Sequence, residues 1–313
     1  MSDLPFVSEQ DLTGRWTWRG ACDAIREGHI GAQADIGDTL ITQNQNSLLV
    51  RSAWLPEIAC GVKVASVFPD KDPKLSKTKA VQSICILFDP STGDPKALID
   101  GNLVTKIKTA ADSVLGAELL ARENSETLTI LGAGVVAASL IDAYIAVFPN
   151  IKRILIWNRT HASAQRLAEA KNSDRVVVEA INDLEQALTT ADMISSATMS
   201  KTPFIKGNWI KSGTHVDLIG AFAPDMREAD DELVRRGEIF VDSRKTAIDD
   251  IGELKIPIAN VIICRDDIRG DFYDLCPGKT GRSNRDAITI FKNGGGGHMD
   301  LMIANYLLSS MQH

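Results

Sequence analysis

Residues 128–137, Leu-Thr-Ile-Leu-Gly-Ala-Gly-Val-Val-Ala, decide the fold of this chain. A short apolar run typical of a buried strand comes first, a Gly-x-Gly-x-x-Ala turn follows, and a helical pattern continues to residue 148. In such a turn Gly132 allows a sharp reversal, Gly134 lets the backbone approach a bound group, and Ala137 lets the helix pack near the strand. Because the first N–H groups of the helix attract an anion, the stretch predicts a site for the pyrophosphate of a dinucleotide.

The chain on both sides of this turn alternates apolar strands with helices. We expect a helix at 161–171 and strands at 154–157, 176–178, 193–195, 216–219, 239–241 and 261–264. Such alternation is typical of a parallel sheet with helices on both faces, and it favours the dinucleotide interpretation over an ordinary glycine turn.

The N-terminal part of the chain has a different texture. Residues 61–68 predict a strand that places Lys63, Ala65 and Val67 on one face. A Pro/Gly/Asp-rich turn between two β-rich runs predicts a hairpin, so this part is expected to be an antiparallel sheet. The other elements expected outside the alternating region are strands at 80–88, 96–99 and 287–291 and helices at 103–122 and 298–310.

The end of the second predicted strand distinguishes between the two nicotinamide dinucleotides. An acidic residue there would bind the ribose 2′-hydroxyl of NAD, but this chain has Asn158-Arg159-Thr160. Arg159 can pair with a 2′-phosphate and Thr160 can hydrogen-bond to it. The alternative is that Arg159 is a solvated loop charge. The pattern predicts NADP(H) as the preferred cofactor, with NAD(H) as the alternative.

A second candidate for cofactor binding is Ser196-Ala197-Thr198, directly after a predicted strand. Small residues at the carboxyl end of a parallel strand line the crevice in which dinucleotides lie. The other interpretation of these residues is a plain helix N-cap.

Composition limits the possible partners. The 313 residues are 44% hydrophobic and 24% charged, and 34 Lys and Arg stand against 41 Asp and Glu, a net charge of −7. An acidic chain without a basic cluster argues against nucleic acid and anionic membranes as partners. There is no apolar run that could span a bilayer and no signal-peptide pattern. The five cysteines are scattered without a C-x-x-C pair, so we expect no metal site, no disulfide framework and a cytoplasmic location.

Several segments, taken in order, resemble the ornithine cyclodeaminase/mu-crystallin family. The resemblance runs nearly end to end and implies a homodimer, a nicotinamide cofactor and a small α-amino or α-imino acid as substrate. It also implies that the substrate domain combines N-terminal and C-terminal segments. The segments that carry the resemblance are residues 61–64, 87–93, 108–113, 131–135, 156–160, 220–228 and 291–300.

The resemblance and the alternating pattern together define two domains. We expect an α/β fold with a Rossmann dinucleotide-binding domain at residues 116–289. Residues 1–115 with 290–313 are expected to form a discontinuous α+β domain for substrate binding and dimerisation.

The family holds the carboxylate of its substrate with cations. Lys63 matches the strand lysine of the family, and it lies among apolar neighbours where an unpaired cation would be costly. Lys108 stands where many members have arginine. The early arginine of the family does not align; Asp38 lies near that place, and Arg51 is the candidate substitute. We predict Arg51, Lys63 and Lys108 as substrate-binding residues, with surface charges as the alternative for Arg51 and Lys108.

Phe222 is the most informative departure from the family pattern. In ornithine cyclodeaminases the matching residue is an aspartate that assists the chemistry and binds the distal amine. A phenyl ring does neither, so the chain most resembles the bacterial members that reduce Δ1-pyrroline-2-carboxylate to L-proline. Δ1-Piperideine-2-carboxylate, reduced to L-pipecolate, is similar in shape. The alternatives are an ornithine cyclodeaminase that uses NAD, an alanine dehydrogenase, and a mu-crystallin-like NADPH-binding protein.

The proton for such a reduction must come from a nearby acid. We predict Lys63 as the catalytic residue, with a bound water as the alternative source. His298 could also donate a proton or simply start the last helix. Asn293 and Gly294 match family positions near the nicotinamide, although the glycine run 294–297 could be a flexible connector. The predicted cofactor-binding residues are Lys108, Gly132, Gly134, Val135, Val136, Asn158, Arg159, Thr160, Thr198 and Gly294.

Overall fold

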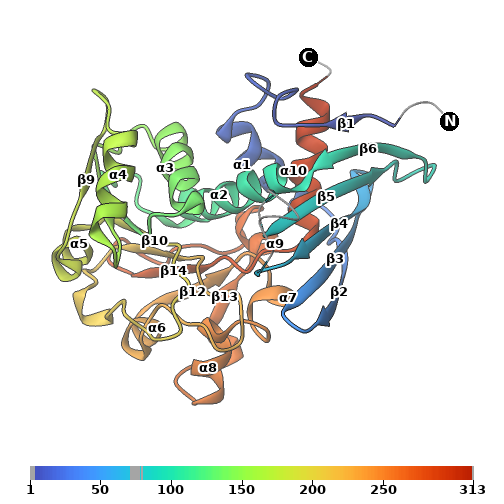
Figure 1. Cartoon of the computed structure of the whole chain (residues 1–313). Coiled ribbons are helices and arrows are strands. Elements are labelled where there is room, and N and C mark those ends of the chain that lie inside the picture. Colours follow the sequence, from blue (N-terminus) through green and yellow to red (C-terminus); the bar gives the residue numbers. More distant parts are fainter. Residues whose placement is uncertain (1–3, 71–77, 79, 312–313) are drawn as a thin grey trace. The chain divides into compact units, whose positions relative to one another are not determined.

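The computed structural model describes residues 4–70, 78 and 80–311 (Figure 1). The chain divides into two compact units: unit 1 comprises residues 1–108 with 296–313, and unit 2 comprises residues 109–295. Residues 109–115 and 290–295 therefore belong to unit 2, whereas the sequence pattern placed them in the other domain. The first boundary falls inside helix α2 (Gly101–Leu120), where an uninterrupted apolar stripe gives no sign of it.

Unit 1 is built on a six-stranded sheet in the order β1-β6-β5-β4-β3-β2, counted over the described residues. Strands β2 to β6 are antiparallel neighbours, as the hairpin pattern predicted, and β1 runs parallel to β6. Helix α10 packs on the sheet and α1 packs on α10. The bounds are β1 (Phe6–Val7), α1 (Trp18–Gly28), β2 (Asp35–Gln43), β3 (Asn46–Leu55), β4 (Ala59–Val67), β5 (Val81–Phe88), β6 (Pro95–Asp100) and α10 (Gly297–Ser309).

A row of side chains crosses this sheet on the face that α10 covers. Asp38 of β2 is the register partner of Arg51 in β3, and Arg51 is the partner of Lys63 in β4. Lys63 in turn faces Cys85 of β5. Directly opposed residues in neighbouring strands point to the same face, so these four side chains lie side by side. The predicted orientation of Lys63 is confirmed, because Lys63 and Ala65 are buried.

The other face of the same sheet is apolar, and none of its large apolar side chains is buried. Trp54 of β3 is 50% exposed and Ile41 of β2 is 58% exposed. A continuous apolar sheet face that remains accessible marks an interaction surface rather than an ordinary protein exterior. The face consists of Ile41, Leu48, Val50, Trp54, Val62, Val64, Ile84, Ile86 and Phe88.

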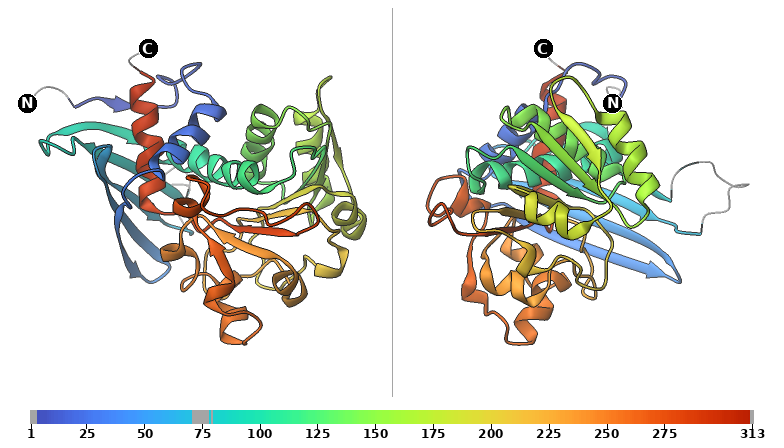
Figure 2. Two further views of the ribbon diagram at one scale, coloured as in Figure 1. Left: turned by 180° about the vertical axis from the view of Figure 1, so that it is seen from behind. Right: turned by 90° about the vertical axis from the view of Figure 1, so that its left-hand side faces the viewer.

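Unit 2 contains an eight-stranded parallel sheet in the order β13-β12-β14-β11-β10-β7-β8-β9, counted over the described residues. Helices lie on both of its faces (Figure 2). Strand order reverses between β7 and β10, and such a switch point leaves a crevice at the carboxyl ends of the two strands. The strands are β7 (Thr127–Leu131), β8 (Arg153–Trp157), β9 (Val177–Ala180), β10 (Met193–Ser196), β11 (His215–Leu218), β12 (Glu238–Val241), β13 (Ile268–Gly270) and β14 (Thr289–Lys292).

The helices of unit 2 connect these strands. Helix α3 packs against β7, and α4 packs against β8 and β9, as the strand–helix alternation predicted. The bounds are α3 (Val135–Val147), α4 (His161–Lys171), α5 (Leu184–Thr190), α6 (Asp231–Arg236), α7 (Arg244–Ala247), α8 (Gly252–Ala259) and α9 (Phe272–Leu275), with 3₁₀ turns η1 (Gly207–Trp209) and η2 (Arg265–Asp267).

The strand predicted at residues 261–264 is wrong. Helix α8 ends at Ala259, and Val261 has a left-handed backbone (φ 58°) with its side chain 88% exposed. This apolar run therefore forms the turn after α8, because its valine cannot join a strand with a positive φ. The edge strand of the sheet is β13, which follows seven residues later along the chain.

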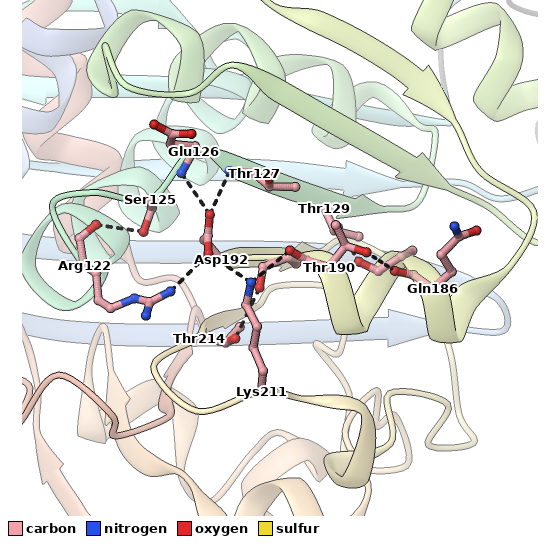
Figure 3. Close-up of polar contacts among 12 residues, drawn as sticks. Arg122, Ser125, Glu126, Thr127, Thr129, Gln186, Thr190, Asp192, Lys211 and Thr214 are labelled. Carbon is pink, nitrogen blue, oxygen red and sulfur yellow. Dashed lines mark hydrogen bonds and ion pairs between the residues drawn. The ribbon is translucent and has the colours of Figure 1, made fainter.

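Asp192 fastens the amino-terminal edge of the same sheet (Figure 3). Its carboxylate accepts the backbone N–H groups of Glu126 (3.0 Å) and Thr127 (3.1 Å) at the start of β7. Arg122 and Lys211 donate to its other oxygen at 3.0 and 3.1 Å. One carboxylate thus joins the beginnings of β7 and β10 at the edge opposite the crevice.

Packing within unit 2 gives a test of the fold at Gly116. A Cβ on Gly116 would lie 2.7 Å from the ring of Phe291. Glycine to alanine in an exposed helix interior stabilises by up to ~1 kcal/mol, but this contact is below any normal carbon–carbon distance. We expect Gly116→Ala to lower the free energy of unfolding by about 1–3 kcal/mol in urea denaturation. Lys106→Ala, at an exposed position of the same helix, should change it by less than about 0.5 kcal/mol; equal or greater stability of Gly116→Ala would contradict the packing described.

Candidate functional site

The turn between β7 and α3 has the shape required for a pyrophosphate. Gly132 has a φ of 114°, and a Cβ at this residue would lie 2.8 Å from the carbonyl oxygen of Ala197. A side chain is excluded on both grounds, so only glycine allows the reversal. The N–H of Gly132 donates to the carbonyl of Trp157 (2.8 Å), which fixes the turn against the end of β8.

The first turn of α3 is open where an anion would bind. A Cβ at Gly134 would meet nothing within 4 Å, and Gly134 caps the helix without a side-chain hydrogen bond. Val135 is 68% exposed and Val136 is half-buried. The first N–H groups of an α-helix have no partner inside the helix, so here they are available to an anion. These residues therefore fit the pyrophosphate of a dinucleotide.

The residues after β8 leave a cation free beside this turn. Arg159 is exposed and forms no ion pair with any residue that the structure describes. Asn158 donates from Nδ2 to the carbonyl oxygen of Thr160 (2.9 Å), which closes the loop. Thr160 precedes α4 and makes no side-chain capping bond. The guanidinium and the hydroxyl can both be offered to a phosphate.

The residues after β10 belong to the crevice and not to a helix. Residues 197–206 are irregular and the next helical turn is η1, so the N-cap interpretation of Ser196 is wrong. The Ser196 side chain instead donates to the carboxylate of Glu228 (2.6 Å). Thr198 donates to the same carboxylate from its hydroxyl (2.6 Å) and its backbone N–H (2.9 Å). The sequence analysis identified Ser196 and Thr198, which donate these hydrogen bonds, but did not identify Glu228, which accepts them.

A buried ammonium lies behind the same edge of the sheet. Lys292, at the end of β14, is fully buried and donates to the carbonyl oxygens of Leu218, Ala221 and Asn293, each at 2.8 Å. Burial lowers the pKa of Lys292, whereas nearby buried carboxylates, Glu253 first among them, oppose that shift. The ammonium therefore connects the ends of β11 and β14.

A second buried carboxyl group lies among hydroxyls and an amide. Asp217 of β11 accepts from Ser195 Oγ (2.6 Å) and Ser113 Oγ (3.0 Å), and Asn293 Nδ2 donates to Ser113 Oγ (3.0 Å). Asn293 is thereby held as an element of the core, and the adjoining Gly294 N–H donates to Asp242 (2.8 Å). These bonds show an anchored backbone at the start of the glycine run rather than a flexible connector.

Phe222 lies four residues after the end of β11, directly after Ala221, whose carbonyl Lys292 holds. Its side chain is 66% exposed. An exposed aromatic ring on a firmly bonded loop is suited to contact a ligand, and it offers no group that could transfer a proton.

In unit 1, Lys63 forms a buried ion pair that the sequence did not reveal. Its Nζ lies 2.6 Å from Oδ1 of Asp300 in α10, and the two side chains are 8% and 1% exposed. It also donates to Thr105 Oγ1 (3.3 Å). A buried carboxylate offsets much of the cost of burying the ammonium. Asp300 lay inside a segment that carried the family resemblance, but no local pattern marked it as a partner of Lys63.

The other predicted cations differ in their surroundings. Arg51 Nε lies 3.2 Å from Asp38 Oδ2 on the neighbouring strand, so the residue near the early arginine position of the family is the counter-ion of Arg51. Lys108 is only 4% exposed, which argues against a plain surface charge. The structure brings Arg51 and Lys63 together in one row of unit 1.

His298 lies in the first turn of α10, where its ring packs edge-on to His29 at 5.3 Å and is 2% exposed. Burial lowers the pKa of His29 to about 4, although its bond to the Ile25 carbonyl opposes that shift. This contact favours the structural interpretation of His298.

Some features of the described residues bear on other classes of site. No described His, Cys, Asp or Glu residues form a group of three or more that could hold a metal ion. All five cysteines are free. None of the helices within the described part of the chain is long and apolar enough to cross a membrane.

Taken together, the parallel sheet, the switch point and the open glycine turn define a Rossmann-type dinucleotide-binding α/β protein. The chain belongs to the ornithine cyclodeaminase/mu-crystallin family, whose sequence profile matches residues 40–313. The family resemblance and the fold class inferred from the sequence are both confirmed.

Individual relatives resemble the chain over most of its length. It is 48% identical to the Δ(1)-pyrroline-2-carboxylate reductase of Paracoccus denitrificans over 98% of this chain and 96% of the relative. It is 35% identical to the ketimine reductase mu-crystallin of Mus musculus, over 73% and 69% of the two chains. The solved structure of Thermococcus litoralis Δ(1)-pyrroline-2-carboxylate reductase in complex with NADH and L-proline superposes with a TM-score of 0.89, at 27% identity over 98% and 97% of the chains.

The buried carboxyl groups of unit 2 give a pH dependence of stability. Burial raises the pKa of Asp217 to about 7, although the serine hydroxyls and Lys292 oppose the shift. A folded-state pKa above the unfolded value of ~4 contributes stability that is complete below that value and is lost as pH rises through ~7. We expect the free energy of unfolding to fall by about 2 kcal/mol per such group between pH 5 and pH 8.

Asp217→Asn should remove its own share of this dependence, about 2 kcal/mol, whereas the contribution of Glu253, whose pKa burial likewise raises to about 7, remains. His29, whose folded-state pKa is lowered, acts in the opposite direction over the same range and is the same in both proteins. Urea denaturation at several pH values measures the slope. Asp225→Asn, which changes an exposed carboxylate paired with Lys201, serves as the control and should keep the original slope. An unchanged slope in Asp217→Asn would show that Asp217 is not the titrating group.

Proposed function

We propose that the chain reduces a cyclic ketimine carboxylate with a nicotinamide cofactor, converting Δ1-pyrroline-2-carboxylate to L-proline and Δ1-piperideine-2-carboxylate to L-pipecolate. The observation that carries this is a combination within one chain: an open dinucleotide turn at Gly132–Gly134, a buried lysine at residue 63, and Phe222 where cyclodeaminases have aspartate. The reductases named among the relatives support the same activity.

The bound cofactor would supply hydride to C2 of the imine. For the chain itself, the α3 N-terminus holds the pyrophosphate, and Ser196 and Thr198 lie at the adjoining strand end. Arg51 and Lys108 attract the substrate carboxylate. The ammonium of Lys63, held by Asp300, can hydrogen-bond to the imine nitrogen and donate a proton to it directly or through a water. The ring of Phe222 forms an apolar wall for an uncharged substrate ring.

The cofactor preference that fits the chain is NADP(H). Arg159 is exposed and unpaired among the described residues, and no acidic side chain at the end of β8 competes for the ribose. A guanidinium beside a 2′-phosphate forms a strong charge-assisted bond that NAD cannot make.

The oligomeric state that fits the chain is a homodimer. The outer face of the unit 1 sheet carries nine apolar side chains, none of them buried, over β2 to β5. In a homodimer with two-fold symmetry, the same face of a second copy of the chain would cover these apolar side chains. Sedimentation of the protein and of a Trp54→Lys variant tests this, because a charge buried within such an interface should give a monomer.

Activity is tested by following NADPH absorbance with each cyclic imine. Lys63→Met should lower kcat/KM by about 10²–10⁴-fold, because it removes the proton donor while keeping side-chain length. Lys106→Met, at an exposed lysine of α2, is the matched control and should keep full activity. Wild-type protein that oxidises neither NADPH nor NADH with either imine, or that releases ammonia from ornithine, would overturn the proposed function.

Cofactor preference is tested at Arg159. Arg159→Leu should raise KM for NADPH by about 10–100-fold and leave KM for NADH nearly unchanged, because only the 2′-phosphate contact is lost. Arg166→Leu, at an exposed arginine of α4, should leave both KM values unchanged. Equal effects of Arg159→Leu on both cofactors would count against the phosphate role.

A further inference from the structure

We propose that Glu228 is a positioning residue for the nicotinamide half of the cofactor: its buried carboxylate joins the loops that follow β10 and β11 and sets the direction of their hydrogen bonds. The proposal rests on the proposed function through the cofactor and goes beyond it in assigning this residue. Glu228 lies on an irregular segment after β11 and is fully buried.

Four hydrogen bonds converge on the Glu228 carboxylate. Oε1 accepts the Ser196 hydroxyl (2.6 Å), the Thr198 hydroxyl (2.6 Å) and the Thr198 N–H (2.9 Å). Oε2 accepts the N–H of Gly220 (2.8 Å). The first three donors lie at the end of β10 or directly after it, and the fourth follows β11, so a single side chain joins two neighbouring strand ends at the edge of the sheet where a dinucleotide lies.

The backbone that carries Glu228 is itself held in place. Glu253 accepts the N–H of Glu228 (2.8 Å) and the N–H of Ala229 (2.9 Å). Burial raises the pKa of Glu228, whereas the hydroxyls of Ser196 and Thr198 and the buried ammonium of Lys292 oppose that shift. Lys292 also holds the carbonyl of Ala221. The loop between Gly220 and Phe222 is therefore bonded through an N–H at its start and through a carbonyl directly before the phenyl ring. Glycine is required at residue 220, because a Cβ there would lie 1.8 Å from the Thr198 carbonyl oxygen.

This arrangement fixes the chemistry that Thr198 can offer. Its hydroxyl has one hydrogen, and that hydrogen is given to Glu228. Toward a ligand, the hydroxyl can then act only as an acceptor. Thr198 also adjoins Ala197, whose carbonyl lies against the Gly132 turn, so it continues the pyrophosphate site along the switch point. An acceptor at this place suits the N–H groups of a carboxamide or a ribose hydroxyl.

Glu228→Gln tests the proposal, because an amide keeps only one acceptor oxygen, so either Gly220 or the donors of Ser196 and Thr198 lose their acceptor. We expect at least tenfold faster amide hydrogen exchange at Thr198 or at Gly220 in the cofactor-free protein. We expect Kd for NADPH, measured by fluorescence without substrate, to rise about tenfold. In imine reduction kcat should fall more than KM rises, because the nicotinamide would be bound but misdirected.

Asp192→Asn is the matched control, because Asp192 also fastens two strands by backbone N–H groups but at the opposite edge of the sheet (Figure 3). It should lower Tm without changing Kd for NADPH. If Glu228 had a purely structural role, Glu228→Gln and Asp192→Asn would show the same change in Kd for the same loss of Tm. That result would overturn the proposal, and so would an unchanged Kd in Glu228→Gln.

Thr198→Val provides the second variant if Glu228→Gln does not fold, since it removes the acceptor and one bond to Glu228. It should raise Kd for NADPH about tenfold, and Thr198→Ser should restore it; unchanged binding in Thr198→Val overturns the assigned role. If the wild-type protein binds NADPH but reduces neither imine, the proposed function is overturned but the role of Glu228 is not. A higher Kd for NADPH in Glu228→Gln would then still support that role.

Discussion

The fully buried ammonium of Lys292 is the interaction on which unit 2 depends. It binds three backbone carbonyls at the ends of β11 and β14, and Glu253, Glu228, Asp242 and Asp217 each act on its charge. Taking one ammonium out of water costs several kcal/mol, and so does burying each carboxylate. The ammonium and the carboxyl groups each lower the cost of burying the other, so removing Lys292 would leave the carboxyl groups without a buried cation.

This cluster explains why the carboxyl edge of the sheet can be both polar and rigid. Loops in such positions normally expose their N–H and carbonyl groups to water. Here Glu228 accepts from the loops after β10 and β11, and Lys292 donates to the loop before Phe222. The loops consequently keep a fixed shape while their outer surface stays free for a ligand. Rigid support of this kind is what a site needs to orient a hydride donor and an imine.

The local sequence pattern identified many of the elements and the glycine turn. The apolar alternation located most strands of unit 2, and Gly132 with Gly134 marked the open start of α3. The pattern failed at residues 261–264, where a left-handed Val261 turns an apolar run into a loop. The order of the strands in the sheet could not be predicted from the local pattern either. Strand β14 lies between β11 and β12 in the sheet, although it comes well after both of them in the chain.

Pairing across the fold could not be predicted from the sequence. Lys63 was identifiable as a lysine among apolar neighbours, but nothing near it indicates Asp300. Glu228 was visible only as part of a motif, because its four donors come from two other segments of the chain. Such partners are set by strand register and strand order, which local periodicity does not contain.

The Lys63–Asp300 pair affects the order in which the two units can fold while the chain is being made. Proteins are made from the N-terminus, and domains fold as units once their segments are available. The strand that carries Lys63 emerges before unit 2, whereas the helix that carries Asp300 emerges only after all of unit 2 has been made. Until then the ammonium has no carboxylate partner in α10, and burying it alone would be costly. Unit 2, whose residues are contiguous, can therefore be complete before unit 1 is.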